Sequence, residues 1–233
     1  MRCYLFTSSC SVAAILAVVF FGNGALVFGD EEATRRTVTL DVYYESLCPD
    51  SIRWFKKQLL PSYDALKDHL ALTFVPYGKA SYGKNPKNDE WQLTCQHGSA
   101  ECDGNMAQAC AVNAIQKEIQ GERAQDLTVA VLGCAMTARY PPTAVPQCAR
   151  NAGLSDAILS SINDCIQGPL SKELFVENGK KTEKLNPPLS FVPSFTFMGR
   201  SMPDIQDDIL NHLLKEVCSV LSGPRRPQQC DSA

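Results

Sequence analysis

Cysteine is the residue type that most constrains how this chain can fold. The sequence holds eleven cysteines, and two of them, Cys3 and Cys10, lie in an N-terminal stretch with the layout of a secretory signal peptide. Without that stretch nine remain, an odd number. Cysteines pair in an oxidising compartment, so an odd count predicts one thiol that is left free, reactive or bonded to another molecule. The first question is therefore which cysteine stands alone.

The N-terminal stretch begins with Arg2 and continues with an apolar run over residues 12–21, followed by small residues. About ten apolar residues are too few to span a bilayer as a helix, which takes ~20. We therefore expect residues 1–29 to be a signal peptide, cut after Gly29 or nearer the N-terminus, with a membrane anchor as the alternative. The mature chain, residues 30–233, has the length of one domain.

The net charge of the whole chain is -3, with acidic and basic residues well mixed. A protein that binds nucleic acid needs a basic patch or stripe, and this chain has no polybasic run. We expect no nucleic-acid partner and, because no later stretch is as apolar as the first, no membrane span. The composition does not indicate an oligomeric state.

Hydrophobic periodicity orders the N-terminal half of the mature chain. Residues 37–44 alternate between apolar and polar side chains, which predicts a strand. After Cys48 the apolar spacing becomes helical, with Pro61 inside the pattern, so we expect one helix kinked at Pro61 or two short helices. A second strand is expected over residues 71–77, followed by a loop to about Glu90 that is rich in glycine, lysine, asparagine and proline.

The middle of the chain has helical periodicity and holds six of the nine remaining cysteines. The predicted helices are residues 105–120, 126–137, 155–166 and 171–177. Asn178-Gly179 tolerates a positive φ and is expected to end the last of them. After this block we expect a strand over residues 191–198, a turn at Gly199-Arg200 with a short strand behind it, and a helix over residues 204–221.

The order of these elements predicts the fold class. Without the helical block, which covers about residues 95–184, strands and helices follow one another as in thioredoxin. We therefore predict an α/β, thioredoxin-like fold with a disulfide-rich helical insertion.

Cys48 lies at the predicted junction between the first strand and the following helix. Unpaired backbone N–H groups and the positive end of the helix dipole stabilise a thiolate there, and the thiolate is the form that attacks disulfides. Pro49 suits the first turn of a helix, and Ser51 is placed to donate a hydroxyl hydrogen bond to the sulfur. Trp54 and Phe55 come next, and we expect one in the core and one at the rim. Cys48 and Ser51 are the candidate catalytic residues.

Pro193, preceded by Val192, interrupts the strand predicted after the helical block. In thioredoxin-like folds such a proline is cis and lies beside the reactive sulfur, and it leaves backbone groups open to pair with a substrate chain as an added strand. Val192 and Pro193 are therefore the candidate substrate-binding residues. The alternative is a proline of an edge strand that has no role in binding.

The most specific pattern of the sequence lies in residues 95–110. The segment matches C-Q-H-G-x2-E-C-x2-N-x4-C at every fixed position: Cys95, Gln96, His97, Gly98, Glu101, Cys102, Asn105 and Cys110. It resembles the signature of the gamma-interferon-inducible lysosomal thiol reductase family. The stretch from Tyr43 to Cys48 also resembles that family's strand into the active site, and the order of elements agrees from about Thr37 to Cys230.

The resemblance implies a thioredoxin fold with a helical insertion and the reduction of disulfides in unfolding proteins. In that family a C-x-x-C pair does the chemistry: the first thiolate forms a mixed disulfide, and the second cysteine releases it. Here Ser51 stands in the second position, and a hydroxyl cannot attack a disulfide at a useful rate. We therefore expect no bound cofactor, and an external thiol such as cysteine or glutathione to resolve the adduct at Cys48.

The same substitution accounts for the odd number of cysteines. With Cys48 set aside, eight remain, which is enough for four bridges, although eight cysteines allow 105 connectivities. Cys134 with Cys148, and Cys218 with Cys230, are plausible local pairs.

Zinc is the main alternative for the signature cysteines and His97. The spacing Cys95-x6-Cys102-x7-Cys110 lacks a short C-x2-4-C element, and a secretory chain favours disulfides, so we expect no metal. For His97 we favour a structural hydrogen bond over a catalytic role.

The leading hypothesis is a thiol oxidoreductase that acts on disulfide-containing or unfolding proteins through Cys48 alone. One rival is a protein that captures partners through lasting mixed disulfides, and the other is a non-redox secreted interaction or immune factor. The chain has no Asn-x-Ser/Thr sequon, whereas the resemblance implies sorting to lysosomes through tagged glycans. Secretion is therefore the simpler expectation, and the lysosome is the alternative.

Overall fold

The structure, a computed structural model, describes residues 37–201, 203–224 and 226–232. The signal peptide predicted for residues 1–29 lies outside the described residues. Within the described ranges, no helix combines the length and the apolar character that crossing a membrane requires.

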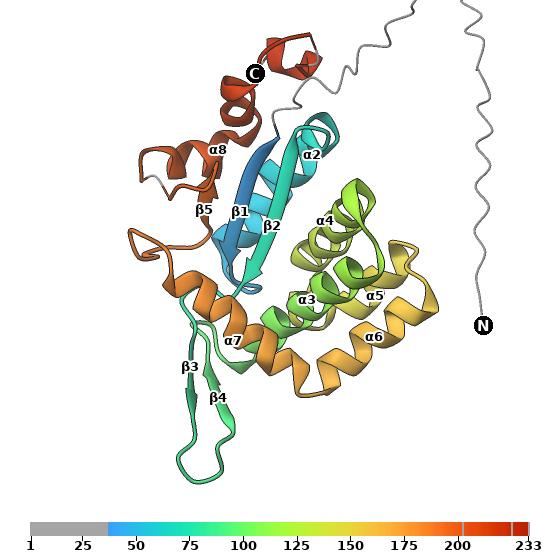
Figure 1. The fold of residues 1–233 in the computed structure, drawn as a ribbon, viewed down its shortest axis with the longest axis vertical. Helices are drawn as coiled ribbons and strands as arrows, with labels where there is room; N and C mark the ends of the chain where they lie inside the picture. Colours follow the sequence, from blue (N-terminus) through green and yellow to red (C-terminus); the bar gives the residue numbers. More distant parts are fainter. Residues whose placement is uncertain (1–36, 202, 225, 233) are drawn as a thin grey trace, which may run out of the picture. The chain divides into compact units, whose positions relative to one another are not determined.

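A sheet of three strands, in the order β2-β1-β5, carries the site (Figure 1). β1 (Val38–Tyr44) pairs parallel with β2 (Leu70–Pro76) and antiparallel with β5 (Ser194–Phe197). The strand predicted for residues 37–44 is confirmed, because its apolar positions are buried. The carboxyl end of β1 leads directly into the turn that holds Cys48.

Between β1 and β2 the chain forms α1 (Pro49–Trp54), a π-helix η1 (Phe55–Leu59) and α2 (Leu60–Leu66). The break expected at Pro61 therefore lies before the proline, where the helix widens and closes with an i→i-5 hydrogen bond. Pro61 then falls at the start of α2, directly after the π-helical turn.

A β-hairpin replaces the loop predicted after the second strand. β3 (Ser81–Lys84) pairs antiparallel with β4 (Trp91–Thr94), and Figure 1 shows the hairpin projecting beyond α7. The rings of Tyr82 and Trp91 lie 5.8 Å apart, and the Lys84 ammonium lies 4.3 Å from the centre of the Trp91 ring. The loop prediction is wrong because four-residue strands with many polar side chains carry too little alternation to be recognised, and cross-strand contacts form them.

Five α-helices follow between β4 and β5. They are α3 (Ser99–Glu118), α4 (Gly121–Thr137), α5 (Val145–Asn151), α6 (Asp156–Gln167) and α7 (Leu170–Glu183), with a 3₁₀ turn η2 (Pro141–Thr143) at the prolines. Figure 1 shows α3 to α6 gathered beside β2. They share a core of their own that is rich in small residues, among them Ala107, Ala111, Ala114, Ala135 and Ala149.

α7 continues to Glu183, so the helix end predicted at Asn178-Gly179 is wrong. Glycine is required at position 179 for a different reason. A Cβ at Gly179 would lie 2.6 Å from a ring carbon of Tyr82 and 2.8 Å from ring carbons of Tyr77. Gly179 is therefore needed because α7 packs closely against two tyrosines, which the sequence pattern of the helix does not reveal.

β5 begins directly after Pro193, so the strand predicted over residues 191–198 is shorter than expected. Gly199 has a positive φ of 73° and forms the predicted turn. In the described part of the segment that follows, the predicted short strand is reduced to an isolated bridge at Arg200.

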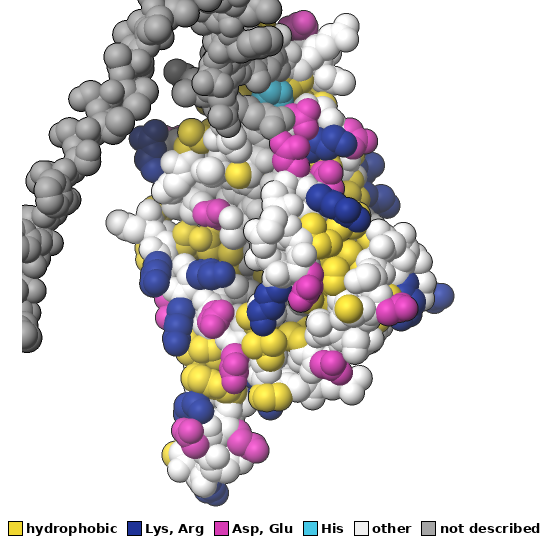
Figure 2. Space-filling model, turned by 45° about the vertical axis from the view of Figure 1, so that its right-hand side comes forward, with side chains coloured by type: hydrophobic (Ala, Val, Ile, Leu, Met, Phe, Trp, Pro, Cys, Tyr) yellow, Lys and Arg dark blue, Asp and Glu magenta, His cyan; other side chains and the backbone are white. Residues whose placement is uncertain are grey.

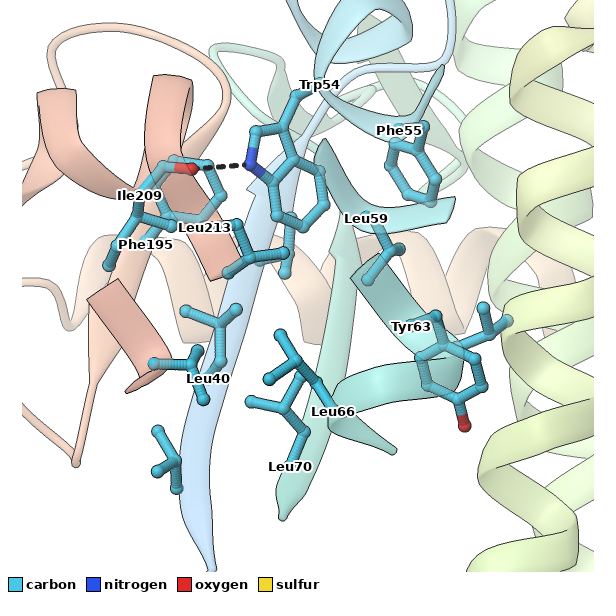
Figure 3. Packing of buried hydrophobic residues seen from close by; sticks show 14 of the residues in the cluster. Leu40, Trp54, Phe55, Leu59, Tyr63, Leu66, Leu70, Phe195, Ile209 and Leu213 are labelled. Carbon is cyan, nitrogen blue, oxygen red and sulfur yellow. Dashed lines mark hydrogen bonds between the residues drawn. The ribbon is translucent and has the colours of Figure 1, made fainter. Parts of the chain in front are cut away.

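α8 (Pro203–Val220) and the helices after β1 pack on one face of the sheet, and Figure 3 shows the buried side chains between them. The Trp54 ring lies 5.0 Å from that of Phe195, and its indole N–H donates to the carbonyl of Ile209 at 2.9 Å. Trp54 and Phe55 are both buried, so the expectation that one lies at the rim is wrong. Burial of such large apolar side chains is the main stabilising contribution here.

Four disulfides hold the described chain: Cys95–Cys102, Cys110–Cys165, Cys134–Cys148 and Cys218–Cys230. The two local pairs predicted from the sequence are confirmed. The last bridge joins α8 to η3 (Gln228–Asp231). Three of the four bridges lie in the helical segment between β4 and β5 or at its start. The fold is thus α/β and thioredoxin-like, with a disulfide-rich helical insertion.

Charged side chains of both signs are mixed on the face of the molecule that Figure 2 draws. Lysine and arginine alternate there with aspartate and glutamate, and apolar groups lie between them. This face therefore carries no large patch of one charge, in keeping with the mixed charges of the sequence.

Candidate active site

Cys48 is the N-cap residue of α1, directly after the turn that follows β1. Among the residues that the structure describes, it is the only cysteine outside a disulfide, as the odd count predicts. Its backbone carbonyl accepts from Ile52 N–H at 3.0 Å, which begins the helix. The sulfur thus lies at the amino end of a helix that starts with Pro49, where backbone N–H groups favour a negative charge.

Val192 and Pro193 lie next to this sulfur, although 144 residues separate Val192 from Cys48 in the chain. The thiol donates to the carbonyl of Val192 at 3.7 Å. The peptide bond between Val192 and Pro193 is cis, which confirms the geometry predicted for a proline at this position. The structure therefore brings together three of the residues chosen from the sequence.

Ser51 is fully buried and makes a different contact from the one predicted. Its hydroxyl oxygen accepts from the backbone N–H of Glu45 at 3.4 Å. No hydrogen bond joins Ser51 to the sulfur, whose own thiol donates to the Val192 carbonyl, so the predicted contact is wrong. Ser51 joins the first turn of α1 to the end of β1 and takes no direct part in the contacts of the sulfur.

Cys48 exposes only 6 % of its surface, whereas its neighbours Pro49 and Asp50 are exposed. Asp50 pairs with Arg53 on the outer side of α1, with 2.9 Å between the carboxylate and the guanidinium. The sulfur is therefore less accessible than an openly exposed thiol.

The signature segment, residues 95–110, is hydrogen-bonded to the turn that leads to Cys48. The amide oxygen of Asn105 accepts from Ser46 N–H at 2.8 Å, and the Ser46 hydroxyl donates to the carbonyl of Glu101 at 3.0 Å. A Cβ at Gly104 would lie 2.4 Å from the Ser46 oxygen, so the glycine is what allows the turn to approach α3 this closely. Two of the eight fixed signature positions thus act by positioning the turn that ends at Cys48.

His97 and Glu101 form a second contact with the same turn. His97 Nδ1 lies 2.6 Å from Glu101 Oε2 and 3.4 Å from Glu45 Oε2. Both glutamate side chains are fully buried, and the imidazole is 34 % exposed. Burial raises the pKa of Glu45 above its ordinary value, and the charge of Glu101 adds to this, while the Lys79 N–H and His97 oppose it. His97 therefore makes a structural hydrogen-bonding contact, as predicted, and its partner is Glu101.

The remaining signature residues shape the start of α3. Gly98 is its N-cap residue with a positive φ of 87°, and Gln96 is exposed on the turn before it. Cys95 is bonded to Cys102, and Cys110 is bonded to a distant helix. Disulfide sulfurs are not thiolates, so these three cysteines cannot ligate zinc.

Glu45 is the residue at this site that the sequence reasoning missed. It follows the buried Tyr44 and comes immediately before the turn to Cys48. A carboxylate in that position, directly after a buried strand, is the signal that could have identified it, because a buried charge needs a partner. Its partner comes from the signature segment, which the spacing along the chain does not reveal.

The chain is similar to known proteins over most of its length. Residues 39–152 match the family model described as "Gamma interferon inducible lysosomal thiol reductase (GILT)". A "Gamma-interferon-inducible lysosomal thiol reductase" of Carassius auratus is 33% identical over 83% of this chain and 72% of its own length, and a "Gamma-interferon-inducible lysosomal thiol reductase-like protein" of Anopheles gambiae is 34% identical over 83% of this chain and 80% of its own.

Among solved structures, DsbA of Chlamydia trachomatis aligns with 80% of this chain and 89% of its own, at 9% identity and a TM-score of 0.49. The two sequence relatives show the family, because both exceed 30% identity and are covered over more than two thirds of their length. The chain belongs to the gamma-interferon-inducible lysosomal thiol reductase family.

Proposed function

We propose that this protein is a thiol-disulfide oxidoreductase that attacks protein disulfides with the thiolate of Cys48. The observation that carries the proposal is the environment of the sulfur: an unbridged cysteine at the N-cap of α1 that touches the carbonyl before a cis proline. Helix N-termini stabilise thiolates, and thiolates are the nucleophiles of disulfide exchange.

The first step is the attack of the Cys48 thiolate on one sulfur of a substrate disulfide. The S–S bond breaks, a mixed disulfide with Cys48 forms, and the second substrate sulfur leaves as a thiolate that takes a proton from solvent. A small thiol then attacks the mixed disulfide and releases the other substrate thiol, leaving its own sulfur on Cys48. A second small thiol regenerates the Cys48 thiolate and forms the small-molecule disulfide.

The external reductant follows from Ser51, which occupies the place of the resolving cysteine. A hydroxyl is too weak a nucleophile toward sulfur to release the adduct. The reaction needs no bound cofactor, since the two electrons come from two molecules of a small thiol such as cysteine or glutathione. Such chemistry fits a secreted chain or one delivered to lysosomes.

Val192 and Pro193 are proposed to hold the substrate backbone. In the resting protein the Val192 carbonyl accepts from the thiol. Once the sulfur is ionised it has no proton to donate, so the carbonyl becomes free to accept from a substrate N–H. A disulfide-containing or unfolding polypeptide could then add beside β5 as an extended segment.

The test is reduction of a model protein disulfide with excess cysteine at pH 5 and pH 7. We expect slow reduction by the mature protein at a rate proportional to the cysteine concentration. Cys48→Ser should reduce the rate to that of cysteine alone. Ser51→Cys should increase it and weaken its dependence on cysteine, because an internal thiol now resolves the adduct. Equal rates for all three proteins would refute the proposed activity.

A second function, the capture of partners through lasting mixed disulfides, is favoured by the lack of any other free thiol among the described residues. Both functions share the first step and differ in the second. Incubation with a disulfide substrate, followed by intact-mass measurement, separates them. An adduct at Cys48 that persists in millimolar cysteine indicates capture, whereas one that disappears within the assay indicates turnover.

A further inference from the structure

Three side-chain atoms that could bind a metal ion come from separate parts of the chain and lie close together beside the turn that leads to Cys48. They are Oε2 of Glu45 at the end of β1, Nδ1 of His97 before α3, and Oε2 of Glu101 within α3, and all lie within 4.8 Å of one another. Two carboxylates and an imidazole form a donor set that suits zinc, which accepts nitrogen and oxygen ligands together.

One of these atoms is buried and lacks a hydrogen bond. The side chain of Glu45 is fully buried, so its Oε2 atom is shielded from solvent. This atom has no hydrogen-bond partner. His97 Nδ1 lies 3.4 Å from this oxygen and only 2.6 Å from Glu101 Oε2. A buried carboxylate oxygen without a partner is costly, and a cation bonded to it removes that cost.

The second oxygen of each carboxylate is held by a backbone N–H. Glu45 Oε1 accepts from Lys79 N–H at 2.7 Å, and Glu101 Oε1 accepts from His97 N–H at 3.0 Å. These bonds fix the two carboxylates so that both Oε2 atoms are directed to the imidazole, as outer-shell partners do around metal ligands. Gly78 makes room for the arrangement, since a Cβ there would lie 2.3 Å from the Glu45 side chain.

The separations fit a small ion with little movement. Two ligands that each bond zinc at 2.0–2.1 Å with tetrahedral angles lie about 3.4 Å apart. Glu45 Oε2 and His97 Nδ1 already have a separation of 3.4 Å. The Glu101 to His97 separation of 2.6 Å would have to widen by under about 1 Å. The imidazole can make this movement because it is 34 % exposed, and the same exposure leaves a path for the ion and for a water ligand.

We propose that Glu45, His97 and Glu101 form a binding site for a zinc ion, with water completing the coordination. The site contains no cysteine, so it is separate from the zinc alternative that the disulfides exclude. The bound ion would connect the turn that leads to Cys48 with α3 more firmly than the present hydrogen bonds. It would be structural, and its binding does not depend on whether Cys48 turns over.

The test is titration of the disulfide-intact mature protein with ZnCl₂ at pH 7 by isothermal titration calorimetry. All proteins carry Cys48→Ser, so that the free thiol cannot bind zinc. We expect one zinc per chain, and we expect His97→Gln to weaken binding at least about tenfold. His212→Gln is the matched control: His212 is exposed on α8, and its loss should leave the affinity unchanged.

X-ray absorption of the zinc-loaded protein supplies a second measurement. It should show nitrogen and oxygen ligands at about 2.0–2.1 Å and no sulfur at about 2.3 Å. Thermal unfolding without zinc checks that His97→Gln is folded, and Glu45→Gln, which keeps the side-chain shape, is the second variant. The proposal is overturned if no zinc binds, if binding survives both variants, or if sulfur is among the ligands.

Discussion

The sheet core and the core of the helical block are built from different side chains. The sheet core is filled by large residues, among them Trp54, Phe55 and Phe195, and none of its buried members within the described chain is an alanine. In the helical block six of the thirteen buried members are alanines. A small side chain lets helices approach closely but removes little apolar surface from water.

The disulfides follow the same division. Cys110–Cys165 and Cys134–Cys148 both lie within the helical block, whereas the sheet region is closed by Cys218–Cys230 near the C-terminus. A bridge stabilises chiefly by limiting the unfolded chain, so it adds stability where apolar burial is modest. The comparison suggests that the sheet depends on packing and the helical block on covalent links.

Trp54→Ala should have the largest effect on stability. The indole is 1 % exposed, contacts Phe195 and donates to Ile209, so its removal leaves a cavity and an unpaired carbonyl. We expect a loss of up to about 5 kcal/mol in the free energy of unfolding, measured by guanidinium denaturation. Tyr140→Ala, at an exposed aromatic, is the control. A loss below about 1 kcal/mol for Trp54→Ala would contradict a core held by large side chains.

Removal of a disulfide from the helical block should have the next largest effect on the free energy of unfolding. The Cys110→Ala and Cys165→Ala pair opens a bridge with a sequence separation of 55, and the Cys134→Ala and Cys148→Ala pair opens one with a separation of 14. Loop entropy predicts losses of about 4 and about 3 kcal/mol respectively. Denaturation of the two double variants under the same conditions measures the difference. The reverse order would show that native contacts outweigh the limits on the unfolded chain.

Ala111→Leu tests the close packing of the helical block. Ala111 is fully buried in α3 among residues of α4 and neighbouring helices, so a larger side chain forces them apart. We expect a loss of about 2 kcal/mol in the free energy of unfolding. Ala157→Leu, at an exposed position of α6, should change it by less than about 0.5 kcal/mol. Equal effects at both positions would mean that the alanines are not required for packing.

The smallest effect concerns pH. Partial burial, with the charge of Asp208, raises the pKa of Glu216 on α8 above its ordinary value of 4.5. The folded state then holds the proton more tightly than the unfolded state, so this contribution to stability is complete below pH 4.5 and is lost as pH rises through the raised value. Glu216→Gln should reduce the decrease in the free energy of unfolding that is measured as pH rises from 4. Glu118→Gln, at an exposed position, should leave this decrease unchanged. Parallel curves for wild type and Glu216→Gln would exclude the effect.

Much of the site could be predicted because its signals are local. The strand before Cys48 and Pro49 at the helix start each depend on a few neighbouring residues, whereas the cis bond at Pro193 is predicted from the place of such a proline in thioredoxin-like folds. Counting predicted one unpaired thiol, and Ser51 in the place of the family's second cysteine pointed to Cys48. The prediction that the helix ends at Asn178-Gly179 was wrong for the opposite reason. Gly179 is required by its close contact with tyrosines of other segments, which are distant in the sequence.

The amino-acid sequence by itself determined the first strand, the helical character of the middle block, the odd number of cysteines that leaves one unpaired, and the family. These depend on periodicity, covalent chemistry and fixed spacing, which are properties of the chain before it folds. Only the tertiary structure decided that Trp54 is buried, that Ser51 contacts Glu45 and that Glu45 meets His97 and Glu101. Such contacts join segments far apart in the chain, and their energies depend on burial and distance, which exist only once the segments have packed.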